Sequence, residues 1–156
     1  YLIAASNKSI YAFELKDGSR KCFLDSHDTQ VTALEITPDN FLVSGSHSGE
    51  IFMWKVETCT LVHSFNINKP IKSIKHINSN NLAVAIDDSL FPILRYNSMG
   101  NMIHNILFFS NISLGVSERI NHIEKYSNSF YCVFNLKIEK RSVNSPNTVE
   151  KTYTFA

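Results

Sequence analysis

The side chains best suited to acid–base or nucleophilic chemistry lie around His27, which stands between Ser26 and Asp28. A serine, a histidine and an acid activate a hydroxyl only when folding joins their atoms in a chain of hydrogen bonds, which adjacency in sequence does not provide. The interpretation we favour is structural: His27 lies in a loop and is tied to a neighbouring strand. We therefore predict no catalytic residue and a protein that is not an enzyme.

Metal and cofactor sites also find no support in the residue spacing. The other histidines are His47, His63, His76, His104 and His122. They form no HxH or HxxxH pair, and none pairs with a cysteine at an interval typical of zinc ligands. Asp87 and Asp88 are adjacent, so on a strand end their carboxylates point to opposite faces. With no glycine-rich phosphate loop either, we expect no metal ion and no cofactor.

Composition and charge limit the classes of partner. The chain has 156 residues, of which 44% are hydrophobic, so it can build a core. Its net charge of +1 gives no field that attracts nucleic acid, which stays a possible partner without support from charge. Three lysines, Lys69, Lys72 and Lys75, do not share one face of a strand, and we expect them to be solvated. Polar residues interrupt the apolar stretch 102–116, so no membrane span is expected.

The cysteines indicate a compartment. Cys22, Cys59 and Cys132 are odd in number and widely spaced, and no CxxC pair occurs. This pattern favours free thiols in a reducing environment, so we expect a cytoplasmic or nuclear protein.

The elements that must position these residues repeat about every 40 residues. "YLIAAS" (1–6) aligns with "FLVSGS" (41–46) and "NLAVAI" (81–86), and "SIYAFEL" (9–15) aligns with "EIFMWKV" (50–56). Each segment is short, apolar or alternating, and rich in β-branched and aromatic residues, which is typical of strands.

Turn sequences separate these segments and complete the fold prediction. "KDGS" (16–19) suits a tight hairpin and "TPDN" (37–40) a type I turn. Four short antiparallel strands per repeat predict an all-β chain of β-propeller blades. We divide it into strands b, c and d over 1–28, full blades over 30–66 and 70–110, and a divergent blade over 119–156. A closed ring needs about four to eight blades, so about three and a half blades indicate part of one propeller, with an unusually small four-blade closure as the alternative.

Two stretches, "SGSHSGEIFMWK" (44–55) and "DSHDTQVTAL" (25–34), resemble the WD-repeat (WD40) family. The resemblance implies a hydrogen-bonded chain through His27, Ser44 and Trp54 that ends on an aspartate in the turn between strands b and c. Ser48 stands where that aspartate belongs. We therefore expect the blades to depend on apolar packing, at about 25 cal/mol per Å², more than on polar bonds worth about 0.5–1.5 kcal/mol each.

The resemblance also implies a function. WD-repeat propellers are protein-interaction scaffolds, so we expect a non-catalytic subunit of a multiprotein complex whose partners are other proteins. In that family, residues just before the b–c turn and at the entrances of the inner strands meet ligands. By position these residues are Asn7, Gln30, His47, Lys69 and Asp87.

Two alternatives remain open. The chain also looks faintly like WD-repeat subunits of ribosome-assembly complexes, and an RNA-associated subunit would show a salt-dependent affinity. "SIYAFELKDGSRKCF" (9–23) looks like a blade of a quinoprotein-type propeller, which is ligand-binding or enzymatic. A cofactor in a propeller of that type needs stacking tryptophans, and this chain has one tryptophan.

Overall fold

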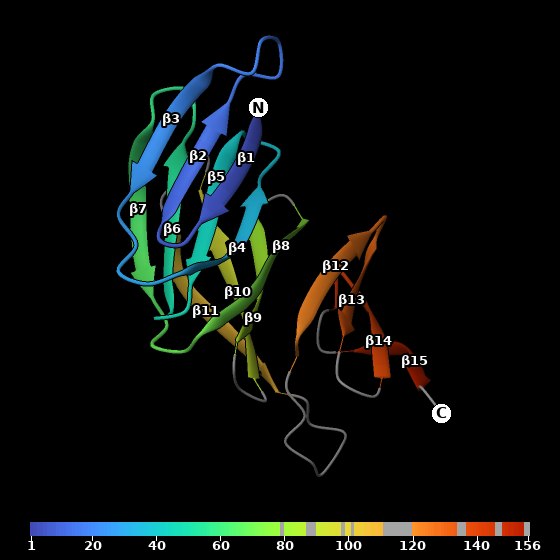
Figure 1. Ribbon diagram of the computed structural model, residues 1–156. Coiled ribbons are helices and arrows are strands. Elements are labelled where there is room, and N and C mark those ends of the chain that lie inside the picture. The colour runs from blue at the N-terminus through green and yellow to red at the C-terminus, as the bar shows by residue number, and fades with distance from the viewer. Residues whose placement is uncertain are drawn as a thin grey trace.

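In the computed structural model the chain forms antiparallel β-sheets joined by turns (Figure 1). The structure describes residues 1–78, 80–86, 90–97, 99–100, 102–110, 120–133, 137–145 and 148–154. Within these ranges there are strands and turns but no helix. The expected all-β class with four-stranded antiparallel sheets is confirmed.

The first two sheets follow chain order. The first contains β1 (Leu2–Ser6), β2 (Ser9–Phe13) and β3 (Arg20–Asp25). The second contains β4 (Val31–Ile36), β5 (Phe41–Ser46), β6 (Glu50–Lys55) and β7 (Thr60–Asn66). Each strand pairs with the next one along the chain, because short turns bring antiparallel neighbours together.

The third and fourth sheets repeat the same order. The third contains β8 (Ile71–Asn78), β9 (Asn81–Ile86), β10 (Leu90–Tyr96) and β11 (Met102–Ser110). The fourth contains β12 (His122–Tyr126), β13 (Ser129–Val133), β14 (Lys137–Ser142) and β15 (Val149–Thr154). The first strands of the last three sheets, β4, β8 and β12, contact one another in sequence order. The described residues form no closed ring.

The core consists of three layers, one between each pair of successive sheets. Strand β6 shows how the sequence produces them. Its Phe52 and Trp54 pack toward the first sheet, whereas its Ile51 and Met53 pack toward the third. Because successive side chains of a strand point to opposite faces, a strand buried on both faces needs the unbroken apolar run that the sequence carries here.

Two glycines permit the close contacts of the second sheet. Gly45 lies on β5, where an added Cβ would sit 2.5 Å from the Cγ2 of Ile71 on β8. Gly49 ends the β5–β6 turn with φ of +92°, and a Cβ there would sit 2.6 Å from the backbone nitrogen of Lys69. The turn at Gly49 therefore packs directly on the segment that enters the third sheet.

Candidate functional site

The predicted polar residues of the second sheet form one hydrogen-bonded chain. The indole Nε1 of Trp54 on β6 donates to the Oγ of Ser44 on β5 at 2.9 Å. The same Oγ lies 2.7 Å from the Nε2 of His27, which belongs to the loop between β3 and β4. The Nδ1 of His27 lies 3.3 Å from the Oε2 of Glu50, at the start of β6. The network thus ties the loop to two strands of the sheet.

These contacts assign the protons of the network. Since the Glu50 carboxylate can only accept, the Nδ1 of His27 carries the hydrogen, and in the neutral imidazole Nε2 accepts from the Ser44 hydroxyl, which in turn accepts from Trp54. Burial lowers the pKa of His27, although Glu50 acts in the opposite direction. His27 is therefore a neutral imidazole near pH 7, and its ring stacks on Phe52 with the centroids 4.2 Å apart.

The same burial decides what His27 and Ser44 can do chemically. His27 is 4% exposed and Ser44 is 0% exposed, so no substrate carbonyl reaches the serine oxygen. The serine hydroxyl and both nitrogens of the histidine are already engaged within the protein. A serine–histidine nucleophile requires an accessible oxygen, and this arrangement instead holds a loop in place.

Glu50 supplies the acid that the sequence prediction considered missing. Its Oε2 also accepts from the backbone nitrogen of Asp28 at 3.1 Å and from the hydroxyls of Ser46 and Ser48 at 3.1 and 3.0 Å. Burial alone would raise the pKa of Glu50, but these hydrogen bonds and the one to His27 together lower it. The second sheet therefore has an acid that closes the chain, and the greater weight of packing over polar bonds stays a prediction for it.

Apolar packing does replace the polar chain in the third sheet. Leu94 of β10 takes the position equivalent to Trp54, and it is buried in the layer shared with the second sheet. Leu82 and Val84 of β9 lie in the same layer. Here the apolar side chains hold the sheet against its neighbour.

Four of the five predicted partner-binding residues lie along one edge of the first two sheets, in adjacent turns and loops. The carbonyl of Asn7, in the β1–β2 turn, accepts from the backbone nitrogen of Val31 at 2.7 Å, next to Gln30. The carbonyl of Gln30 accepts from the backbone nitrogen of His47 at 2.9 Å. Lys69 packs by its backbone on Gly49, two residues after His47.

We name these residues the turn row: Asn7, Gln30, His47 and Lys69. Each is exposed at its side chain while its backbone is bonded or packed against a neighbouring turn. Their side chains are thus presented from a fixed backbone. The fifth predicted residue, Asp87, lies outside the described residues.

Lysine and carboxylate side chains connect the last three sheets, which the sequence prediction missed. The Nζ of Lys75 on β8 lies 3.3 Å from the Oε2 of Glu35 on β4 and 3.1 Å from the Oε1 of Glu124 on β12. Burial lowers the pKa of Lys75, but the two carboxylates outweigh it and raise the pKa. The expectation that Lys75 is solvated is therefore wrong, because it pairs with these two carboxylates. The spacing of the lysines along the chain gave no sign that Lys75 lies between two sheets.

A cavity of about 250 Å³ lies beside this ion cluster, between β4, β8 and β12. Its lining includes Lys75, Thr32, Ser73 and His122. A second buried cluster lies on β14, where Glu139 accepts from Lys137 at 2.7 Å and from Arg141. Burial would raise the pKa of Glu139, but these two cations lower it.

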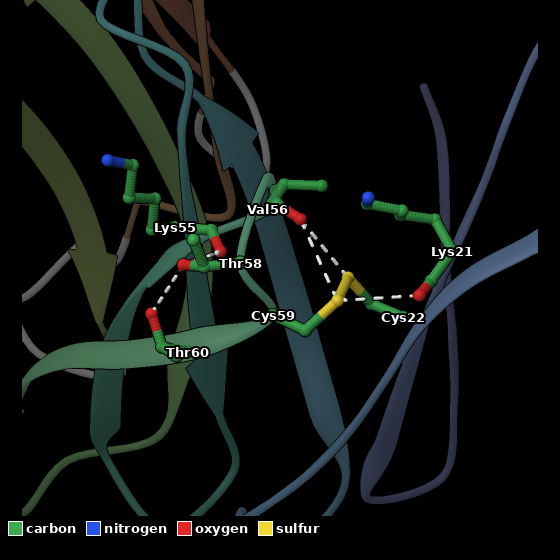
Figure 2. The surroundings of a disulfide bond; sticks show 7 residues. All are labelled: Lys21, Cys22, Lys55, Val56, Thr58, Cys59 and Thr60. Atoms are coloured by element: carbon green, nitrogen blue, oxygen red, sulfur yellow. Dashed lines mark hydrogen bonds between the residues drawn. A yellow bond between two sulfur atoms is a disulfide. The ribbon is translucent and has the colours of Figure 1, made fainter.

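Cys22 of β3 and Cys59 of the β6–β7 turn form a disulfide, with their Cα atoms 5.5 Å apart (Figure 2). The expectation of free thiols is therefore wrong for these two residues. They are 37 positions apart, and only the packing of the first sheet on the second brings them together. Cys132 is free, and burial raises the pKa of its thiol to about 12.

Two kinds of feature are absent from the described ranges. No three histidine, cysteine or acidic side chains there are grouped closely enough to hold a metal ion. Nor does that part of the chain contain a helix with the length and apolar character needed to cross a membrane.

Comparison with known proteins gives one partial similarity. No family model matches the chain. Human DmX-like protein 1 is 33% identical over 66 residues, which are 41% of this chain and 2% of that protein. The chain thus matches a very small part of this relative's length. The similarity to DmX-like protein 1 therefore covers less than half of this chain.

Proposed function

We propose that the protein is a WD-repeat-like β-propeller segment that serves as a non-catalytic scaffold within a multiprotein complex. The observation that carries the proposal is the hydrogen-bonded chain through His27, Ser44 and Trp54, closed by Glu50, within a series of similar antiparallel sheets. The partial similarity to DmX-like protein 1, a WD-repeat protein, supports the same family.

The turn row is the proposed docking surface. Its four side chains offer amides, an imidazole and an ammonium group from backbones that are already held by hydrogen bonds or packing. A partner therefore orders few additional groups on binding, which lowers the entropic cost of association. Lys69 is the single cation of the row, whereas a nucleic-acid backbone is usually met by several. A protein partner fits this surface better than nucleic acid.

The cytoplasm or nucleus remains the proposed location. In such a reducing compartment the glutathione pool would hold Cys22 and Cys59 mainly as thiols, and the disulfide would form when conditions become oxidising. Cell fractionation followed by thiol labelling tests this location. Recovery of the protein in a secreted fraction, with the pair fully oxidised, would contradict it.

The scaffold is tested by affinity purification of the intact protein from its native cells. One variant removes the turn row by N7A, Q30A, H47A and K69A. The matched control carries K16A, S19A, K55A and E57A, in and beside the β2–β3 and β6–β7 turns at the opposite edge, with the same change in net charge. We expect the first variant to lose partner proteins that the wild type and the control both retain.

Two results would contradict the proposal. In one, both variants recover the same partners as the wild type, which means that the turn row does not dock them. In the other, the wild type purifies alone and converts a small molecule, which means that the protein is an enzyme. Circular dichroism of both variants establishes that they are folded before the comparison is made.

A further inference from the structure

The disulfide joins two sheets that share an apolar core layer. Cys22 lies on the edge strand of the first sheet, and Cys59 lies in the turn that precedes the edge strand of the second. Between the two sheets lie Ile10, Leu24 and Trp54 among other buried side chains. We propose that Cys22 and Cys59 form a reversible thiol–disulfide site that clips the first sheet to the second under oxidising conditions.

The backbone around the pair is suited to both redox states. The Sγ of Cys22 lies 3.2 Å from the carbonyl oxygen of Val56, and the Sγ of Cys59 lies 3.4 Å from that of Lys21 (Figure 2). A disulfide has no hydrogen to donate, so in the oxidised protein these are contacts only. After reduction each thiol finds an acceptor already in place, and no buried donor is left unsatisfied. After reduction the two sulfurs must separate to van der Waals distance, and a carbonyl acceptor for each thiol lies nearby.

The two sulfur atoms differ in access, which sets the order of exchange. Cys59 is partly exposed in a turn with φ of +56°, whereas Cys22 is 3% exposed and faces the core. A small disulfide or thiol in solution thus meets Cys59 first. Cys22 is held within reach to complete the exchange, because its Cα lies 5.5 Å from that of Cys59.

The exchange balances with glutathione disulfide as the oxidant. The thiolate of Cys59 attacks one glutathione sulfur, which releases one glutathione and leaves a mixed disulfide. The thiolate of Cys22 then attacks the sulfur of Cys59 and releases the second glutathione. Two protein S–H bonds are lost, one S–S bond forms, and one glutathione disulfide is reduced to two glutathione molecules. Excess glutathione drives the same steps in reverse.

Cys132 provides an internal comparison. It is fully buried in the layer between the third and fourth sheets, and its pKa of about 12 keeps it a thiol at neutral pH. Since the thiolate is the reactive form, Cys132 stays inert in the folded protein. Any thiol that reacts under native conditions therefore belongs to the clip.

The test equilibrates the intact protein in glutathione buffers of different redox ratio, followed by acid quenching, alkylation and tryptic mass spectrometry. The clip appears as a linked pair of peptides, 22–55 and 56–72, whose amount we expect to change reversibly with the buffer. In the reduced protein a short alkylation pulse should label Cys59 at least several-fold faster than Cys22, and should leave Cys132 unlabelled. Hydrogen exchange of the β3 amides should be several-fold faster after reduction.

A C22S/C59S variant is the matched control, because serine hydroxyls can donate to the same carbonyls. Its β3 exchange should not respond to the redox buffer, while that of a C132S variant should respond as the wild type does. The proposal is overturned if no linked peptides form with glutathione disulfide alone, or if excess glutathione never opens them in the folded protein. Equal labelling rates for Cys59 and Cys132 would overturn it as well.

Discussion

Glu50 gives the sharpest test of how the second sheet is held together. We predict that Glu50→Ala destabilises the protein by about 2–3 kcal/mol. The substitution removes the acceptor of four hydrogen bonds, from His27, Asp28, Ser46 and Ser48. The Nδ1 hydrogen of buried His27 is then left without its acceptor, which costs about 1–3 kcal/mol. The lost bonds of the half-exposed Ser48 and the exposed backbone of Asp28 add less, because water can replace Glu50 there.

The expected change is measurable with the protein's own tryptophan. Trp54 is the one tryptophan of the chain and lies two hydrogen bonds beyond His27 in the same network, so its fluorescence reports on unfolding at this place. A loss of 2–3 kcal/mol corresponds to about a 30- to 150-fold change in the unfolding equilibrium. For a chain of this length it lowers the melting temperature by about 4–12 °C. Urea titration of the wild type and the variant gives the free energy of unfolding directly.

Two companion variants make the result interpretable. Glu57→Ala removes an exposed acid next to the same strand, which pairs with the Lys55 Nζ at 3.9 Å, and should cost less than about 0.5 kcal/mol. Glu50→Gln keeps an acceptor oxygen but no charge, so its cost should fall between the other two. If Glu50→Ala and Glu57→Ala give the same free energy of unfolding, the network does not hold the sheet as argued.

Three further predictions concern pH, covalent linkage and the turn. The pKa of His27 is lowered in the folded state, so as the pH falls the unfolded state takes up a proton first, and the free energy of unfolding should be constant above pH 6.5 and decrease below it. Urea titrations at pH 8, 6.5 and 5 should show a smaller decrease in a His27→Gln variant. Under oxidising conditions C22S/C59S should lower the free energy of unfolding by about 4 kcal/mol, the loop entropy of a cross-link over 37 residues, and a denaturant titration that shows no loss in oxidised protein would contradict this. Gly49→Ala should cost more than about 1 kcal/mol in a thermal melt, because φ is +92° and the Lys69 backbone occupies the space for a Cβ, whereas Gly18→Ala meets no atom within 4 Å and should cost less.

The repeat made the strands and their turns predictable from the sequence. Segments such as 41–46 and 50–56 carry strand composition at a constant spacing, and the structure places β5 and β6 there. His27, Ser44 and Trp54 were identified together because their residue types match one family pattern. In the structure they form a continuous chain of bonds.

Contacts between elements were the part that spacing did not reveal. Glu50 was overlooked because it lies two residues beyond the position where a shorter aspartate was expected, and only its longer side chain reaches His27. Cys22 and Cys59 are 37 residues apart, so their pairing depends on how the first sheet packs on the second. The same holds for Lys75, whose partners Glu35 and Glu124 come from different sheets.

The ion cluster at Lys75 bears on how a repetitive chain assembles in the right order. Sheets with similar apolar faces can stack on the wrong neighbour during folding, because the hydrophobic effect does not distinguish one such face from another. Lys75 on β8 meets carboxylates on both β4 and β12 only when the second, third and fourth sheets stack in that order. A shuffled stack would leave Lys75 or a glutamate half-buried opposite no counter-charge, at a penalty that the correct stack avoids. The charges of the cluster thus favour the correct neighbours, which the apolar side chains of these interfaces cannot distinguish.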